Sequence, residues 1–222
     1  MMGGMKRKIR CGGKPMTAIV LAGGRGRRMK ADKASLDIGG KTLLEHVLAQ
    51  VEPYFEELIV SISKGQGRGG PEGLGKAGTG RKSRPDEGGS GLRPVEDEVR
   101  GQGPIGGILA GLRAARNDAC AVVACDMPDI PIPLLRSLAR AARDAEIAVP
   151  VDPAGHYDPL FAIYKRSVAD AIEALLARGE RSLLPLYSVC RTAVMPLGEK
   201  LRLRNLNTRA DYESYIRSIK GE

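Results

Sequence analysis

The chain has 222 residues, of which 42% are hydrophobic, enough for one sizeable core, so we expect a single domain. No apolar run approaches the roughly 20 residues that a membrane span requires, and the basic N-terminus lacks the apolar core and cleavage site of a secretory signal. These features argue against a membrane protein and predict a cytoplasmic one.

The net charge of +9 is concentrated in two segments. Residues 1–16 contain five bases and no acid, and residues 64–93 contain seven bases and three acids, so the rest of the chain is formally neutral. We expect residues 1–16 to be a disordered basic tail and residues 65–91, with eleven glycines, to be a mobile loop. A basic face over the folded domain is not predicted, which argues against a nucleic-acid partner.

The first half of the domain has the pattern of a parallel crossover unit. Residues 17–24 (TAIVLAGG) form an apolar run that ends at two glycines, typical of a buried strand entering a loop. Residues 42–51 have apolar positions at helical spacing, with Thr42 as N-cap and Glu45 as its capping-box partner. Residues 57–63 form a second strand, so the order is strand, helix, strand.

The second half continues the alternation of strands and helices. Helices are predicted at residues 105–115, 131–144, 167–179 (ending at Gly179) and 209–220, and strands at 119–127, 146–151, 157–165, 192–197 and just before Asn205. This order predicts a three-layer α/β/α, Rossmann-like fold with a mostly parallel sheet, forming one domain over residues 17–220.

A glycine-rich loop follows the first strand. Ligands of such sheets lie at the carboxyl ends of the strands. Gly23 and Gly24 would let backbone N–H groups face a polyanion, and Arg28 and Lys33 would supply compensating charge. The segment therefore predicts a triphosphate-binding loop, although an ordinary glycine turn with solvated arginines is the alternative.

The loop sequence LAGGRGRRM...DK is similar to the L-A-G-G-x-x-x-R-M-x-x-x-K signature of glycosyltransferase-A-like nucleotidyltransferases. It most closely resembles the molybdenum cofactor guanylyltransferases, although it is one residue shorter and has Lys30 where glycine is usual. The resemblance implies that the loop binds GTP phosphates and that the lysine contacts the triphosphate. Those nucleotide-binding roles fall on Leu21, Ala22, Gly23, Gly24 and Lys33.

Asp126 ends the apolar strand 119–127 and faces the predicted phosphate loop. A carboxylate there is suited to Mg²⁺, which prefers oxygen ligands and bridges to substrate phosphates. The alternative is a helix N-cap ahead of Pro128. The resemblance extends to the family's C-D-x-P magnesium motif and implies that Asp126 is the metal ligand and a catalytic residue, assisted by Lys33 and Arg28.

The segment Val95-Glu96-Asp97, followed by GPIGG at residues 103–107, resembles the family's E-D and G-P-L-x-G motifs. Guanine presents N1–H and N2–H₂ as adjacent donors that one carboxylate can accept together. The resemblance assigns this role to Asp97, and a solvated acidic cluster is the alternative. Ser61, at the end of the second strand, takes the place of a frequent family asparagine.

A third group of motifs lies nearer the C-terminus. Family segments that are implicated in holding a pterin resemble three segments here: His156-Tyr157-Asp158-Pro159-Leu160, Gly179-Glu180-Arg181 and Asn205-Leu206-Asn207-Thr208. Asn205 and Asn207, at i and i+2 of an extended segment, would share a face and could bind a pterin edge or phosphate. The alternative is a turn that caps the final helix, a role open to Thr208.

The resemblance implies a Mg²⁺-dependent transfer of GMP from GTP to molybdenum-bound molybdopterin. It also implies a phosphorylated pterin as second substrate and transient contact with molybdenum cofactor synthesis or acceptor proteins. Alternatives are transfer to adenosylcobinamide phosphate, to a sugar phosphate, or from CTP to molybdopterin. A nucleotide-binding module without catalysis is a further alternative.

Overall fold

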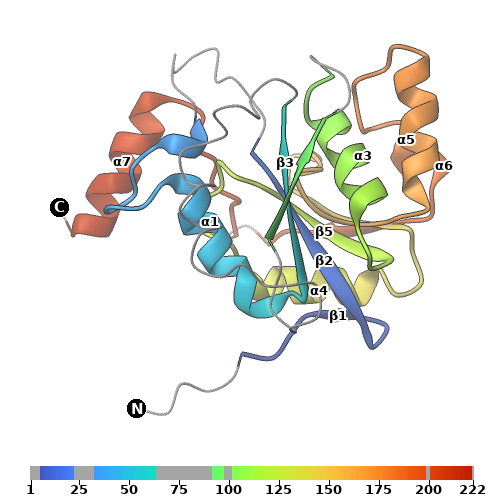
Figure 1. Ribbon diagram of the computed structural model, residues 1–222, viewed down its shortest axis with the longest axis horizontal. Coiled ribbons are helices and arrows are strands. Elements are labelled where there is room, and N and C mark those ends of the chain that lie inside the picture. The colour runs from blue at the N-terminus through green and yellow to red at the C-terminus, as the bar shows by residue number, and fades with distance from the viewer. Residues whose placement is uncertain (1–5, 23–32, 64–91, 98–101, 199–200, 222) are drawn as a thin grey trace.

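The computed structural model describes residues 6–22, 33–63, 92–97, 102–198 and 201–221. Its centre is a mixed sheet in the order β4-β3-β2-β5-β7-β6-β8, with the short β1 paired to β2 (Figure 1). β7 runs antiparallel to both neighbours and β1 is antiparallel to β2, whereas all other pairs are parallel. The strands are β1 (Arg10–Cys11), β2 (Lys14–Leu21), β3 (Glu57–Ile62), β4 (Leu92–Glu96), β5 (Ala119–Ala124), β6 (Ile147–Val151), β7 (Phe161–Lys165) and β8 (Thr192–Pro196).

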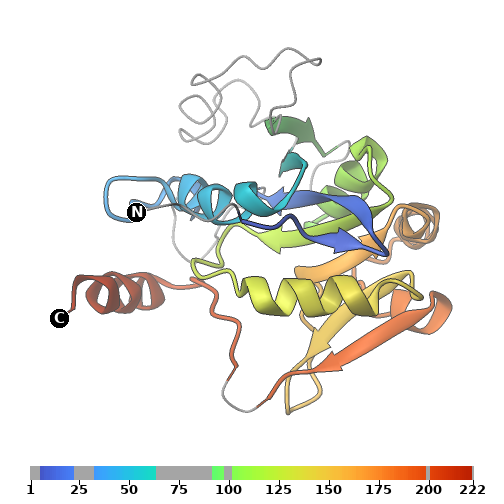
Figure 2. The same ribbon diagram turned by 90° about the horizontal axis from the view of Figure 1, so that it is seen from below.

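Helices cover both faces of the sheet, which confirms the predicted three-layer α/β/α fold (Figures 1 and 2). One apolar cluster joins the sheet to α1, α4 and α7, and the other joins it to α3, α5 and α6. Within the described residues, no helix is long and apolar enough to cross a membrane. The helices are α1 (Leu43–Val51), α3 (Pro104–Ala114), α4 (Ile132–Ala141), α5 (Val168–Ala177), α6 (Leu186–Val189) and α7 (Arg209–Lys220).

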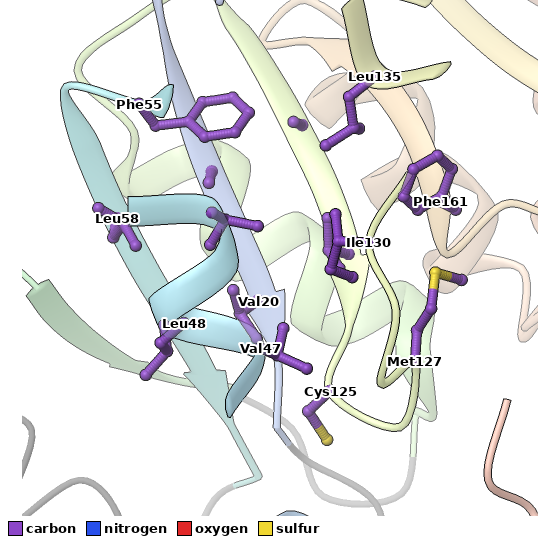
Figure 3. Close-up of a cluster of buried hydrophobic side chains, with 14 of the residues drawn as sticks. Val20, Val47, Leu48, Phe55, Leu58, Cys125, Met127, Ile130, Leu135 and Phe161 are labelled. Atoms are coloured by element: carbon purple, nitrogen blue, oxygen red, sulfur yellow. The ribbon is translucent and has the colours of Figure 1, made fainter. Parts of the chain in front are cut away.

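β2 is an interior strand between β3 and β5, and its apolar side chains are shared between the two layers. Ala18 and Val20 belong to the cluster under α1 and α4, and Ile19 and Leu21 belong to the cluster under α3. Figure 3 shows Val20 beside side chains of α1 in the first cluster. A strand covered on both faces needs apolar residues at successive positions, which is why residues 17–22 read as a continuous apolar run.

The predicted start of α1 is confirmed. Thr42 is the N-cap, its hydroxyl accepts from the N–H of Glu45 at 3.2 Å, and the Glu45 carboxylate accepts from the N–H of Thr42 at 2.8 Å. These reciprocal bonds satisfy two N–H groups that the helix leaves unpaired. They fix where the chain turns from residues 33–41 into the helical layer.

The prediction of a disordered tail is wrong for the part of residues 1–16 that the structure describes. β1 pairs antiparallel with the start of β2, and Ile9 is buried with its N–H bonded to Tyr54 O at 2.8 Å. Gly12 and Gly13, at φ of 56° and 79°, form the two-residue turn between these strands. Two left-handed residues match the twist of a hairpin, and glycine adopts them without steric cost. The basic N-terminal segment is therefore part of the domain from residue 6 onward.

Two further expectations differ from the structure or lie outside it. Residues 201–207, where a strand was predicted before Asn205, form no strand. The predicted mobile loop, residues 65–91, lies outside the described residues, and β4 begins directly after it. β4 was not predicted because only five residues form it, two of them exposed, which leaves too short an apolar pattern.

We expect Gly111→Ala to destabilise the fold, because a Cβ built there would lie 2.6 Å from Ile19 Cγ2 in the core. Overpacking costs more than the gain in helix propensity, so the free energy of unfolding should fall by about 1 to 2 kcal/mol. Urea denaturation of both forms measures the change. Gly198→Ala, where nothing lies within 4 Å of the added carbon, is the control, and an equal effect of both substitutions would contradict the packing argument.

Candidate active site

The carboxyl ends of β2 and β5 are bonded together at one edge of the sheet. Leu21 O accepts a hydrogen bond from Cys125 N at 3.1 Å, so Asp126, the next residue, lies beside the end of β2. Leu21 and Ala22 are both buried there. Lys33 begins the short η1 helix (Lys33–Ser35). The other predicted phosphate-binding residues, Gly23, Gly24 and Arg28, and the side chain of Lys33 lie outside the described residues.

Asp126 is not a helix N-cap, so that alternative is excluded. α4 begins at Ile132 with Pro131 at the N-cap position, several residues further along the chain. The backbone carbonyl of Asp126 instead accepts from Leu206 N at 2.8 Å. This bond joins the end of β5 to the C-terminal segment that contains Asn205 and Asn207, the two asparagines predicted to bind substrate.

Asp158 lies at the same edge as Asp126, because β7 runs antiparallel to β5 and therefore starts where β5 ends. Ala124 N donates to Leu160 O at 3.0 Å, which holds the two chain segments together. Burial and the neighbouring Asp126 carboxylate raise the pKa of Asp158. Two carboxylates from different strands thus converge beside the end of β2, and a bound cation would relieve their repulsion.

Asp97 follows β4 and packs against the first turn of α3. Its N–H donates to Ile62 O at 2.9 Å, and the residue is only 8% exposed, so it is not part of a solvated acidic cluster. A Cβ on Gly106 would lie 2.6 Å from Asp97 Oδ1, and one on Gly107 would lie 2.9 Å from Ser61 Oγ. The glycines of GPIGG therefore let α3 approach both polar side chains closely. Asp97 and Gly106 line a pocket of about 710 Å³.

Thr208 does cap the final helix. Its hydroxyl accepts from Asp211 N at 3.1 Å, and the Asp211 carboxylate accepts from Thr208 N at 2.7 Å and from Asn207 N at 3.0 Å. Asn207 is exposed, whereas the Oδ1 atom of Asn205 is buried without a hydrogen-bond partner in the described part of the chain. A buried carbonyl oxygen of this kind is costly, so Asn205 is the better candidate for a ligand contact.

A second cavity, of about 830 Å³, opens between the β6–β7 connection, Leu197 and residues 201–203. It contains Asp158 and His156, which belong to one of the segments singled out in the sequence, and also Asp152 and Arg202, which the sequence analysis did not select. Asp152 accepts from the N–H of His156 at 2.8 Å and lies 3.1 Å from its Nδ1 atom. The N–H bond and the imidazole lower the pKa of Asp152. Asp152-Pro153 with Gly155 is a turn signature that could have located this loop.

Comparison with known proteins shows which family of proteins this chain resembles. Residues 18–191 match the model of the MobA-like NTP transferase domain. A probable molybdenum cofactor guanylyltransferase of Mycobacterium marinum is 35% identical over 214 residues, covering 91% of this chain and 94% of that one. A molybdenum cofactor guanylyltransferase of Pseudomonas putida is 32% identical over 204 residues, covering 87% and 94%.

Among solved structures, the molybdopterin-guanine dinucleotide biosynthesis protein A of Archaeoglobus fulgidus superimposes with a TM-score of 0.73 at 26% identity. The match covers 93% of this chain and all of that one. The parallel strand edge with its carboxylates, taken with these matches, defines a nucleotidyltransferase. The chain belongs to the MobA-like NTP transferase family.

Proposed function

We propose that this protein is a cytoplasmic enzyme that transfers GMP from GTP to the terminal phosphate of molybdenum-bound molybdopterin, releasing pyrophosphate. The relatives named molybdenum cofactor guanylyltransferase support the reaction. The observation that carries the proposal is that Asp126 and Asp158 converge beside the end of β2. Asp158 also lines the cavity of about 830 Å³, and Asp97 lines the pocket of about 710 Å³.

The half of the edge formed by β2, β3 and β4 would bind GTP. Leu21 and Ala22 lead into Gly23 and Gly24, whose amides would bind the triphosphate together with the side chains of Lys33 and Arg28. Asp97 would accept the N1–H and N2–H₂ donors of guanine. Its burial and its place beside α3 support this role, because a carboxylate that is shielded from water discriminates more strongly between bases.

Mg²⁺ is the proposed cofactor, and the residues present fit it. Asp126 and Asp158 are hard oxygen donors close enough for Asp126 to raise the pKa of Asp158. Asp126 would be the principal ligand. When bound, the ion would neutralise charge that develops on the α-phosphoryl group. Asp158 would then contact both the metal region and the acceptor.

The cavity of about 830 Å³ would receive the phosphorylated pterin, because it shares Asp158 with the edge and lies on the side away from β2. The unpartnered Oδ1 of Asn205 would accept from a pterin N–H group, and Asn207 would contact the acceptor from the exposed side. Partner proteins of molybdenum cofactor synthesis would deliver or receive the pterin by transient contact.

Catalysis requires no general base, since the attacking group is already an anionic phosphate oxygen. The protein would hold the two phosphates in line and neutralise the charge of the transition state, with Lys33 and Arg28 as the cationic side chains. The residues at the edge therefore act by position and charge rather than by proton transfer.

Ligand-dependent thermal stability tests the nucleotide side of the proposal. A ligand that binds only the native state raises the melting temperature, and at equal concentration the tighter ligand raises it more, because the stabilisation grows with the logarithm of the ratio of ligand concentration to Kd. We expect GTP with Mg²⁺ to stabilise the protein more than ATP or CTP with Mg²⁺. Equal stabilisation by all three nucleotides would contradict guanine recognition.

Product analysis tests the acceptor. The purified protein is incubated with GTP, Mg²⁺ and molybdenum-loaded molybdopterin, and the dinucleotide and pyrophosphate are quantified by mass spectrometry. Parallel reactions contain adenosylcobinamide phosphate, a sugar phosphate, or CTP in place of GTP. We expect product with GTP and the pterin. Faster turnover with another pair would replace the proposed acceptor or donor, and no turnover with any pair would favour a binding module.

A further inference from the structure

A third cavity, of about 450 Å³, lies at the end of the sheet opposite the candidate active site. It is formed by the β1–β2 turn, the α3–β5 loop, the α4–β6 loop and the end of β7. In Figure 1 the β1–β2 hairpin occupies the lower end of the sheet, whereas β2 runs upward to the candidate active site. No residue of this cavity, which we name the lower pocket, has a role in the proposed transfer.

Basic side chains predominate among the charged residues of the lower pocket. Lys14, Arg116, Arg143 and Lys165 line it, against two carboxylates, Asp118 and Asp144. The four bases come from four separate chain segments, so their convergence is a product of the fold.

The carboxylates neutralise these bases only in part. Arg143 Nε lies 3.9 Å from Asp144 Oδ1, and Arg116 Nε lies 3.8 Å from Glu57 Oε1, both near the limit of an ion pair. Glu57 is in addition bonded to Thr17 Oγ1 at 2.6 Å. Lys14 and Lys165 form no ion pair with any residue in the described ranges. The lower pocket therefore keeps an excess of positive charge.

The walls of the lower pocket are held by backbone bonds and by buried residues. Lys165 Nζ donates to Arg143 O at 3.2 Å, and Arg166 N donates to Asp118 O at 2.8 Å. Cys11, 7% exposed, forms part of the wall, and a Cβ on Gly12 would lie 3.9 Å from Arg143 Cγ. The charged groups are thus presented by a folded framework rather than by free chain ends, which lowers the entropy that binding costs.

We propose that the lower pocket is a second binding site that takes a small diphosphate, either inorganic pyrophosphate or the phosphate tail of a nucleoside diphosphate. A ligand with several negative charges fits four bases and two acids, and arginines and lysines are the residues that bind phosphate oxygens. A cavity of this volume admits such a molecule but is too small for a polymer. The site is independent of the proposed transfer reaction.

Calorimetric titration with inorganic pyrophosphate tests the proposal, in buffer that contains a chelator so that metal-dependent binding at Asp126 is suppressed. The variant is Lys14→Gln combined with Arg143→Gln. Both side chains are exposed, so their loss should leave the fold intact, which melting curves check. We expect the Kd for pyrophosphate to rise about tenfold or more, the loss expected from one or two charge-assisted hydrogen bonds.

Arg140→Gln is the matched control, because Arg140 is an exposed base on α4 that does not line the lower pocket. The Kd of this control variant for pyrophosphate should stay at the wild-type value. A rise equal to that of the double variant would overturn the proposal and indicate non-specific attraction of pyrophosphate to surface charge. Absence of metal-free binding to the wild type would also overturn it. Titration of the wild type and the double variant with GDP separates the sources: a Kd for GDP that also rises in the double variant indicates a nucleoside diphosphate, and a Kd that rises for pyrophosphate alone indicates the free ion. Neither outcome depends on whether Asp126→Ala abolishes turnover.

Discussion

Asp126→Ala is expected to abolish turnover and to leave the fold intact. The substitution removes the proposed principal metal ligand, whose residue follows directly after the bond between Cys125 N and Leu21 O at the end of β2. Losses of roughly a hundred- to a thousandfold in kcat are usual when one group that stabilises developing charge is removed, and here the bound metal ion would be lost as well. The measurement is pyrophosphate release with saturating GTP and acceptor at several Mg²⁺ concentrations.

The fold should survive because Asp126 is half-buried and its structural bond is made by the backbone. Its carbonyl still accepts from Leu206 N in the alanine variant. Circular dichroism and a melting curve check this point. Asp170→Ala, which removes an exposed carboxylate on α5, is the matched control and should retain full turnover. If Asp126→Ala kept Mg²⁺-dependent turnover, the assignment of the metal site would be wrong.

Asp97→Ala is expected to reduce the preference for GTP over ATP. The carboxylate is the proposed acceptor for two adjacent guanine donors, and adenine does not present that pair. A site built around such a group discriminates by roughly ten- to a hundredfold or more, so the ratio of kcat/KM for GTP and ATP should fall by about that factor. Asp97→Asn keeps the shape of the side chain but replaces one acceptor oxygen by an N–H₂ donor, and it should lower the same ratio.

Glu96→Ala is the control for this second experiment, because Glu96 is the neighbouring carboxylate and is exposed at the end of β4. The ratio of kcat/KM for GTP and ATP in Glu96→Ala should match that of the wild type. An unchanged ratio in Asp97→Ala would mean that the base is recognised elsewhere, and the residues of the 710 Å³ pocket other than Asp97 and the control residue Glu96 would then be the next to test. Stability of both variants is compared by melting curves.

Most strands and helices could be predicted because their residues carry a local pattern. The apolar run of β2, the capping box of α1 and the amphipathic face of α4 each depend on neighbours within one element. The carboxyl ends of parallel strands meet at one edge, so the loop after β2 and Asp126 could also be assigned to one region from the sequence, whereas Asp97 was placed there only by resemblance, because β4 was not predicted. Resemblance to a family then attached roles to those positions.

The errors arose where a few residues depend on a distant partner. β1 has only two residues, too short for any period, although the pair Gly12-Gly13 was a hairpin signal. Once these residues pair with β2, the bases of the N-terminal segment belong to the folded domain, and Lys14 lies beside three bases from elsewhere in the chain at this end. The lower pocket could not be predicted from the sequence, because part of its wall is the N-terminal segment that was predicted to be disordered.

The amino-acid sequence by itself determined the alternation of strands and helices, the order of the polar residues that follow the strands, and the family. Each of these depends on neighbouring residues, whose spacing sets which side chains share a face. Only the tertiary structure decided that β7 runs antiparallel beside β5 and so places Asp158 against Asp126. It also decided that Asn205 keeps a buried carbonyl without a partner and that four bases converge at the far end of the sheet. These are contacts between segments far apart in the chain, and their register follows from how the whole core packs rather than from any local pattern.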